Sequence, residues 1–176
     1  MLLALHGQNK DALAKLKPGA WEYDIVMPGY KCNMTDTNAA IGLAQLRRYD
    51  SEILAKKEQI IRWYEENLRD LKNIELPEFE KEDRKSSLHL YMIRLKGADS
   101  KKRNEIIQKL AEEGVATNVH FQPLPLLTAY KNIGLNIKNY PEAYKMHENQ
   151  ISLPLHNFVS EEDVKYISNI LKEVLS

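Results

Sequence analysis

The chain has 176 residues, which is enough for one domain or slightly more. It carries 25 basic and 25 acidic residues, so no overall field would draw in nucleic acid or a membrane surface. A single cysteine excludes an intrachain disulfide, and no histidines pair at metal-ligand spacing. No segment is long and apolar enough to serve as a signal peptide or a spanning helix. We therefore expect a cytoplasmic protein with neither nucleic acid nor membrane as partner.

The first half of the chain reads as two helices joined by a bend. Thr35 or Asp36 can cap the first helix, and Asp50 followed by a serine offers a second cap where the helix restarts. Gly42 inside the first helix lowers helix stability by about 1 kcal/mol relative to alanine, so we expect another backbone to pack closely there. A second subunit is one candidate for that backbone. The second helix should end near residues 72–73, and its apolar stripe is Leu54, Ile61, Tyr64, Leu68 and Leu71.

The second half of the chain indicates a small sheet with flanking helices, an α/β (α+β) fold. Strands are expected at 88–95, 115–121 and 151–153, and helices at 101–113, at 141–149 and after a capping box at Ser160 and Asp163. Residues 75–85 form a charged connection, and we place the domain boundary at its start. The expected domains are therefore 1–74 and 75–176. We expect the long helices at 36–71 to lie apart from the sheet domain, or to pack on it only in part, and to be covered by a second copy.

Two histidines fall in the predicted strands. Alternation over 115–121 places Asn118 and His120 on one strand face beside a proline-rich loop, where a ligand could bind. A histidine at an edge, exposed to water, fits that pattern equally well. His89 lies in a strand of buried character and is expected to be a hydrogen-bonded core histidine.

A polar loop precedes the first helix. Lys31 and Asn33 alternate with Tyr30 and Cys32, just ahead of a helix N-terminus whose free amide groups and dipole favour an anion such as phosphate. Many helices also begin after a polar loop without binding anything. Cys32 has no neighbouring histidine that could act as its base, so we do not expect a catalytic thiol.

Several ordered motifs resemble one family. "PGYKCNMTDTNAAIGLAQL" (28–46) resembles the stretch that nucleotide-sugar aminotransferases of the DegT/DnrJ/StrS group carry after their cofactor lysine. "HLYMIRL" (89–95), "GVATNVHFQPLPLLTAYK" (114–131) and "SLPLHNFVSEEDVKYI" (152–167) resemble the family's C-terminal domain, in the same order. The resemblance implies the aspartate-aminotransferase fold (fold type I), with long interface helices preceding a C-terminal small domain. It also implies pyridoxal phosphate as cofactor and a homodimer that moves an amino group from glutamate to a nucleotide-linked keto sugar.

By this resemblance, Lys31 and Asn33 contact the cofactor, while Tyr30, Asn118 and His120 line the substrate side. Cys32 stands where the family usually has an aromatic residue. The family's cofactor lysine lies in a Ser-x-His-x-x-Lys segment, and no lysine of this chain has that context. We therefore expect a C-terminal portion of the enzyme that has no catalytic residue and is inactive alone. The other hypothesis is a non-catalytic dimerisation or regulatory domain that associates with a full-length aminotransferase.

Overall fold

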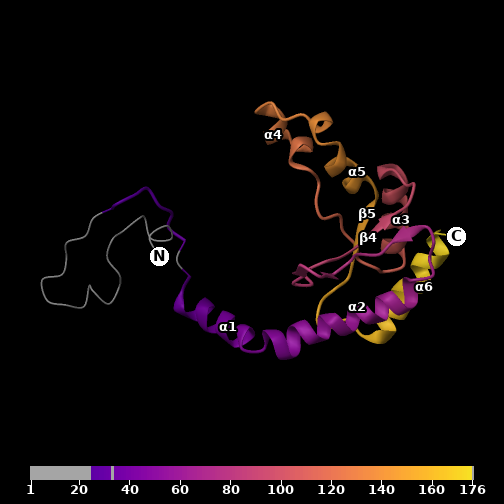
Figure 1. Cartoon of the computed structure of the whole chain (residues 1–176), viewed down its shortest axis with the longest axis horizontal. Coiled ribbons are helices and arrows are strands. Elements are labelled where there is room, and N and C mark those ends of the chain that lie inside the picture. Colours follow the sequence, from indigo (N-terminus) through magenta and orange to yellow (C-terminus); the bar gives the residue numbers. More distant parts are fainter. Residues whose placement is uncertain (1–24, 33, 176) are drawn as a thin grey trace, which may run out of the picture. The chain divides into compact units, whose positions relative to one another are not determined.

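The computed structural model describes residues 25–32 and 34–175. By its internal contacts the chain divides into two compact units, Met1–Arg48 and Tyr49–Ser176. The first unit contains the helix α1 (Asp36–Leu46), and the second contains every later element (Figure 1). The helices of the second unit are η3 (Tyr49–Leu54), α2 (Ala55–Leu68), α3 (Ser100–Glu112), η4 (Leu124–Leu126), α4 (Thr128–Asn132), η5 (Ile137–Asn139), α5 (Pro141–Asn149) and α6 (Glu161–Leu175). Its strands are β1 (Ile74–Glu75), β2 (Glu80–Lys81), β3 (Arg84–Lys85), β4 (Tyr91–Leu95) and β5 (Gln150–Leu153).

Helix α1 begins at a cap supplied by Thr35, whose hydroxyl oxygen accepts a hydrogen bond from the backbone N–H of Asn38 at 3.4 Å. Of the two predicted caps, Thr35 is therefore the one used. No residue of α1 is buried, and a Cβ added at Gly42 would meet nothing within 4 Å. The close packing expected at Gly42 is not found within the described residues of this chain, and packing against a second subunit stays a prediction.

The bend expected near Asp50 is the π-helical turn η3, which leads into α2. The predicted apolar stripe of α2 is confirmed, because Ile61, Tyr64 and Leu68 are buried while Leu54 and Leu71 pack partly against the core. The helix ends at Leu68, earlier than expected. A tighter turn follows it, in which the N–H of Leu71 donates to the carbonyl of Leu68.

The main sheet of the second unit has three antiparallel strands in the order β1-β4-β5, and β2 and β3 form a separate antiparallel pair. Tyr91 pairs with Leu153 and Ile93 with Ile151, and all four residues are buried. Together with the flanking helices, this gives the α/β architecture that the sequence predicts. Within the described ranges, every helix is too short or too polar to cross a membrane.

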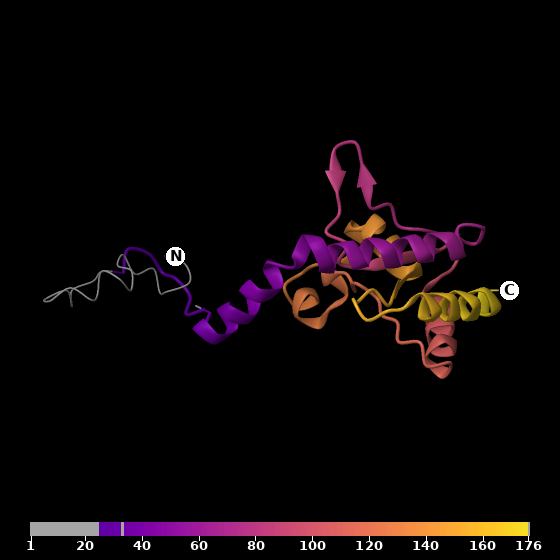
Figure 2. The same cartoon turned by 90° about the horizontal axis from the view of Figure 1, so that it is seen from below.

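Helix α2 belongs to the same core as the sheet. It lies beside α6 (Figure 2), and Ile60, Tyr64 and Leu68 form one apolar cluster with Ile93 and Leu171. Of the two expected alternatives for the region 36–71, partial packing on the sheet domain fits, because α2 is buried against α6 and β4 while no residue of α1 is buried. The expectation that a second copy covers the apolar stripe is wrong for α2, since the chain itself buries it. The contact-based division after Arg48 also does not coincide with the expected boundary between 1–74 and 75–176, which stays a prediction for a longer protein.

The segment 115–121 is not the predicted strand. It touches β5 through one isolated bridge, in which Asn118 and Ser152 exchange two backbone hydrogen bonds of 3.3 and 2.8 Å. In an antiparallel ladder, the next pair that exchanges bonds on one side would join Ala116 to Pro154, which has no N–H to donate. Pro154 thus ends the ladder on that side of the bridge. Phe121 is 70% exposed instead of sharing a buried face with Val115.

Candidate functional site

A pocket of about 310 Å³ lies beside this bridge. Three segments that are distant in the sequence line it, namely 89–90, 116–120 and 152–155. Asn118 and His120, the two residues predicted on the substrate side, both contribute side chains to it. The structure therefore brings this predicted pair together, although on an irregular segment rather than on a strand.

His120 is half-buried and bonded at both ring nitrogens. Its Nδ1 lies 2.8 Å from the Ser152 hydroxyl oxygen, and its Nε2 lies 3.4 Å from the Asn118 amide nitrogen. The Asn118 side-chain oxygen is already engaged, because it accepts the backbone N–H of Val119 at 2.7 Å. The Asn118 amide nitrogen can only donate, so Nε2 accepts and Nδ1–H donates to Ser152. These contacts fit the tautomer with the proton on Nδ1, in which Nε2 accepts the long contact from Asn118.

Ser152 holds this arrangement to the sheet. It lies in the middle of β5, pairs with Met92 of β4, and is almost fully buried. The sequence predicted a strand around Ser152 but not its bond to His120, because nothing in a short buried strand shows which hydroxyl a distant histidine will contact.

His89 lies in the same pocket and is exposed, so the expectation of a core histidine is wrong. The preceding Leu88 is buried and has a φ of +53°, and regular pairing of β4 begins only at Tyr91. The chain therefore turns before the strand, and His89 faces outward although its neighbours in the sequence are apolar.

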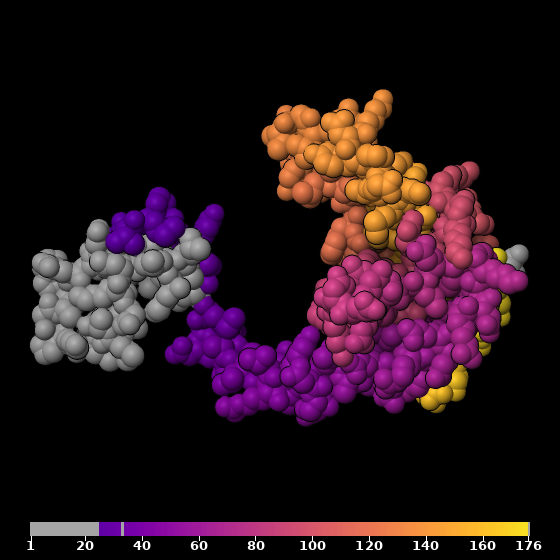
Figure 3. All heavy atoms as spheres, in the orientation of Figure 1, coloured from indigo at the N-terminus to yellow at the C-terminus, as the bar shows by residue number. Residues whose placement is uncertain are grey.

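The segment after His120 lies at the surface of the second unit (orange in Figure 3). The peptide bond between His120 and Phe121 is cis. The apolar side chains exposed from here to the start of α5 are Phe121, Leu124, Leu127, Ile133 and Tyr140.

The predicted cofactor loop belongs to the first unit. Tyr30 is 74% exposed, Lys31 and Cys32 are also exposed, and Asn33 lies outside the described residues. A lysine that forms an aldimine needs a site that lowers its pKa by partial desolvation, and an exposed loop does not provide one. The described residues therefore do not by themselves make a complete site for pyridoxal phosphate. The assignments of Lys31 and Asn33 to the cofactor stay predictions.

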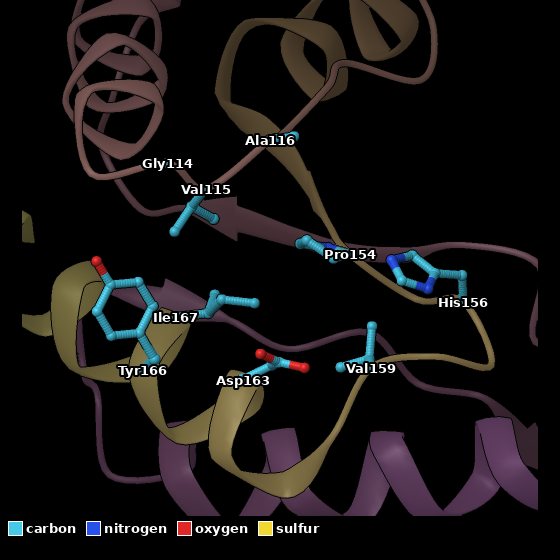
Figure 4. A pocket seen from close by; sticks show the side chains of 9 residues that line it. All are labelled: Gly114, Val115, Ala116, Pro154, His156, Val159, Asp163, Tyr166 and Ile167. Atoms are coloured by element: carbon cyan, nitrogen blue, oxygen red, sulfur yellow. The ribbon is translucent and has the colours of Figure 1, made fainter.

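A second hollow, of about 390 Å³, lies between α6 and the loops that follow α3 and β5 (Figure 4). Buried Val115, Val159 and Ile167 give it an apolar floor, and His156, Asp163 and Tyr166 are its polar groups.

Two of these polar groups already have structural roles. The Asp163 carboxylate accepts the N–H and O–H of Ser160 at 2.8 and 2.9 Å, and the Tyr166 hydroxyl donates to the Glu113 carbonyl at 3.1 Å. The bonds from Ser160, with the nearby His156, hold the pKa of Asp163 below its usual value. The hollow is thus explained by the capping of α6 and the end of α3.

In the described part of the chain, no three His, Cys, Asp or Glu side chains come together as a metal site.

Comparison with known proteins decides the family. Residues 1–172 match the model of the DegT/DnrJ/EryC1/StrS aminotransferase family. The chain belongs to this family. It is 32% identical over 181 residues to the spore coat polysaccharide biosynthesis protein SpsC of Bacillus subtilis, covering 99% of this chain and 45% of SpsC. It is 29% identical to a UDP-4-amino-4,6-dideoxy-N-acetyl-beta-L-altrosamine transaminase of Campylobacter jejuni, covering 99% of this chain and 44% of that protein.

The fold agrees with solved structures of the family. The chain superposes on the PMP-form of "Putative sugar aminotransferase Spr1654" from Streptococcus pneumoniae with a TM-score of 0.87 and 50% identity. This match covers 99% of the chain and 43% of Spr1654. The chain therefore has part of the fold type I architecture of pyridoxal-phosphate-dependent enzymes and spans less than half the length of these relatives. The predicted family and fold are confirmed.

Proposed function

We propose that this chain is part of a sugar aminotransferase that transfers an amino group from glutamate to a nucleotide-linked keto sugar, in the synthesis of cell-surface polysaccharide or of amino sugars. The observation that carries the proposal is the agreement in fold and sequence with Spr1654 over nearly the whole chain. The polysaccharide role of SpsC and the UDP-sugar named for the Campylobacter transaminase support the substrate class.

Within this proposal the His120 pocket binds the sugar. With its Nδ1–H donated to Ser152, the imidazole has an acceptor at Nε2, which can receive a hydrogen bond from a sugar hydroxyl or an acetamido N–H. Asn118 is exposed beside it and can exchange its long contact with Nε2 for a ligand group. The pocket can therefore orient a polar, uncharged ligand edge.

The Tyr30–Asn33 loop completes the proposed site in a homodimer. An exposed tyrosine ring offers a face for stacking, and Lys31 offers a charge for phosphate. Pyridoxal phosphate, when bound, supplies the electron sink for amino transfer. The chain's exposed lysine loop does not replace the aldimine lysine, so we propose that the 176 residues act only together with the missing part of the fold.

Complementation tests the proposal. The chain is mixed with a polypeptide that carries the family's Ser-x-His-x-x-Lys segment and the rest of the large domain, and glutamate-dependent amination of a UDP-linked keto sugar is measured. We expect activity in the mixture, and a loss of about tenfold or more in kcat/KM for His120→Ala, from one lost ligand hydrogen bond.

His156→Ala is the matched control, because this exposed histidine lies in the capping hollow, and it should keep full activity. A mixture that stays inactive although the two polypeptides associate would favour the alternative, a non-catalytic dimerisation or regulatory domain. Full activity of His120→Ala would remove His120 from the site.

A further inference from the structure

His89 is a second histidine in the pocket that holds His120. It lines the pocket of about 310 Å³ together with Asn118 and His120, and it is exposed. The His120 ring is bonded to Ser152 and Asn118, whereas no hydrogen bond or ion pair joins the His89 ring to any other described residue. His89 therefore lies at the pocket with its hydrogen-bonding groups unused.

The backbone before His89 has an unfavourable conformation that its surroundings maintain. Leu88 has a φ of +53°, in the left-handed region, which costs a residue with a Cβ roughly 1–2 kcal/mol. The Leu88 N–H donates to the Ser86 hydroxyl at 3.1 Å, and the Lys57 ammonium donates to the Leu88 carbonyl at 3.0 Å. The Leu88 side chain is buried. These interactions fix the turn, and the residue that the turn places at the pocket is His89.

The pocket has no fixed charge. Among the described residues that line it there is no lysine, arginine, aspartate or glutamate. A phosphate or carboxylate group would find no counter-ion here, whereas a hydroxyl group can both donate and accept. The His89 imidazole offers a donor and an acceptor, the Asn118 amide nitrogen donates, and the His120 Nε2 accepts.

The rest of the lining is largely apolar. Leu90, Leu153, Pro154 and Leu155 form this part of the wall, which suits the C–H face of a sugar ring. A volume of about 310 Å³ lies at the lower end of the range for small-molecule sites, about 300–1,000 Å³. The pocket therefore fits one small ring with several hydroxyl groups.

We propose that His89 binds the sugar ring directly, as the second histidine that contacts ligand in the His120 pocket. This pocket takes the neutral sugar and leaves the phosphate groups of the nucleotide outside. The identity of the ligand as a nucleotide-linked sugar rests on the proposed function, but the pocket and its chemistry belong to the isolated chain.

Titration of the full chain with two probes tests the proposal, followed by NMR of the histidine ring Cε1–H signals. The probes are N-acetylglucosamine, a neutral sugar, and UDP, which carries the nucleoside and the phosphates without a sugar ring on them. We expect N-acetylglucosamine to shift the His89 and His120 signals along one binding curve and to leave the His156 signal in place. UDP should shift neither His89 nor His120.

Variants of the exposed histidines extend the measurement. His89→Ala should weaken the binding of N-acetylglucosamine by about fivefold, the effect of one lost hydrogen bond. His89→Gln should keep most of the affinity, because its amide group also donates and accepts. His156→Ala is the matched control, since it lies in the capping hollow, and should bind as the wild type does.

Two results would overturn the role of His89: a curve in which His120 shifts and His89 does not, or unchanged affinity in His89→Ala. Shifts of both rings with UDP, or none with N-acetylglucosamine up to its solubility limit, would overturn the assignment of the pocket to a neutral sugar. The titrations need no cofactor and measure no activity. An inactive complementation mixture would therefore contradict the proposed function and leave this result unchanged.

Discussion

The rings of Tyr64 and Tyr91 stack with their centroids 4.6 Å apart, which joins α2 to β4 in the core. Both side chains are fully buried, but only the Tyr64 hydroxyl has a partner, the Pro154 carbonyl at 3.0 Å. The Tyr91 hydroxyl has none among the described residues. Burial raises the pKa of both hydroxyls, and nearby charge adds to it, from Asp163 for Tyr64 and from Glu65 for Tyr91.

This pair predicts opposite responses to the same substitution. Tyr64→Phe removes a buried hydrogen bond and should lower the free energy of unfolding by about 1 kcal/mol. Tyr91→Phe removes a buried hydroxyl that has no partner, so stability should stay the same or rise. Urea unfolding of the two variants checks this. A larger loss for Tyr91→Phe than for Tyr64→Phe would contradict it.

The cap of α6 predicts both a stability loss and a pH dependence. Ser160→Ala removes the hydroxyl that accepts the Asp163 N–H at 3.1 Å, and should cost about 1 kcal/mol. The bonds from Ser160 hold the Asp163 pKa below its usual value, so the unfolded chain takes up the proton first on acidification. The stabilisation from this carboxylate is therefore present above about pH 4 and lost as the pH falls through the lower folded-state value.

Asp163→Asn should accordingly narrow the difference in unfolding free energy between neutral pH and about pH 3. Glu162→Gln is the matched control, because it removes a carboxylate from the same helix turn without breaking the bonds from Ser160. Equal narrowing in both variants would show that net charge, rather than the cap, causes the acid dependence.

The exposed side of α1 predicts self-association. Ile41, Leu43 and Leu46 are exposed, and no residue of this helix is buried within the chain. Because exposed apolar side chains on one element favour association, light scattering at micromolar concentration should give a mass above that of the monomer. Leu43→Glu with Leu46→Glu should shift the chain toward monomer, while Gln45→Glu, which adds charge to the same helix, should not. A strictly monomeric wild-type chain would refute the prediction.

The exposed Lys31 predicts the behaviour with cofactor. Added pyridoxal phosphate should give no stable, protein-specific aldimine band in the absorbance spectrum, because a wet lysine does not compete with a partly desolvated one. Lys31→Ala should give the same spectrum as the wild type. A band or transaminase activity from the chain alone that disappears in Lys31→Ala would overturn this view of the loop.

Local chemistry within one or two turns of chain is determined by the sequence itself. Thr35 and Ser160 cap their helices through bonds to residues three positions on, and Pro141 begins α5. Gly114 has a φ of +74°, as expected of a residue that stops α3. The apolar stripe of α2 is equally visible, because helical periodicity alone places its residues on one side.

Contacts between distant segments decided the rest. The apolar stripe of α2 predicts that this side of the helix is buried, but the sequence does not show which elements bury it. In the structure, α6 and β4 cover the stripe. The alternation at 115–121 fits a strand, yet pairing depends on the residues that lie opposite it, and Pro154, which would lie opposite Ala116, cannot donate to a ladder. His89 and His120 differ for the same reason: the direction of each side chain depends on pairing with residues far along the chain, which no local pattern contains.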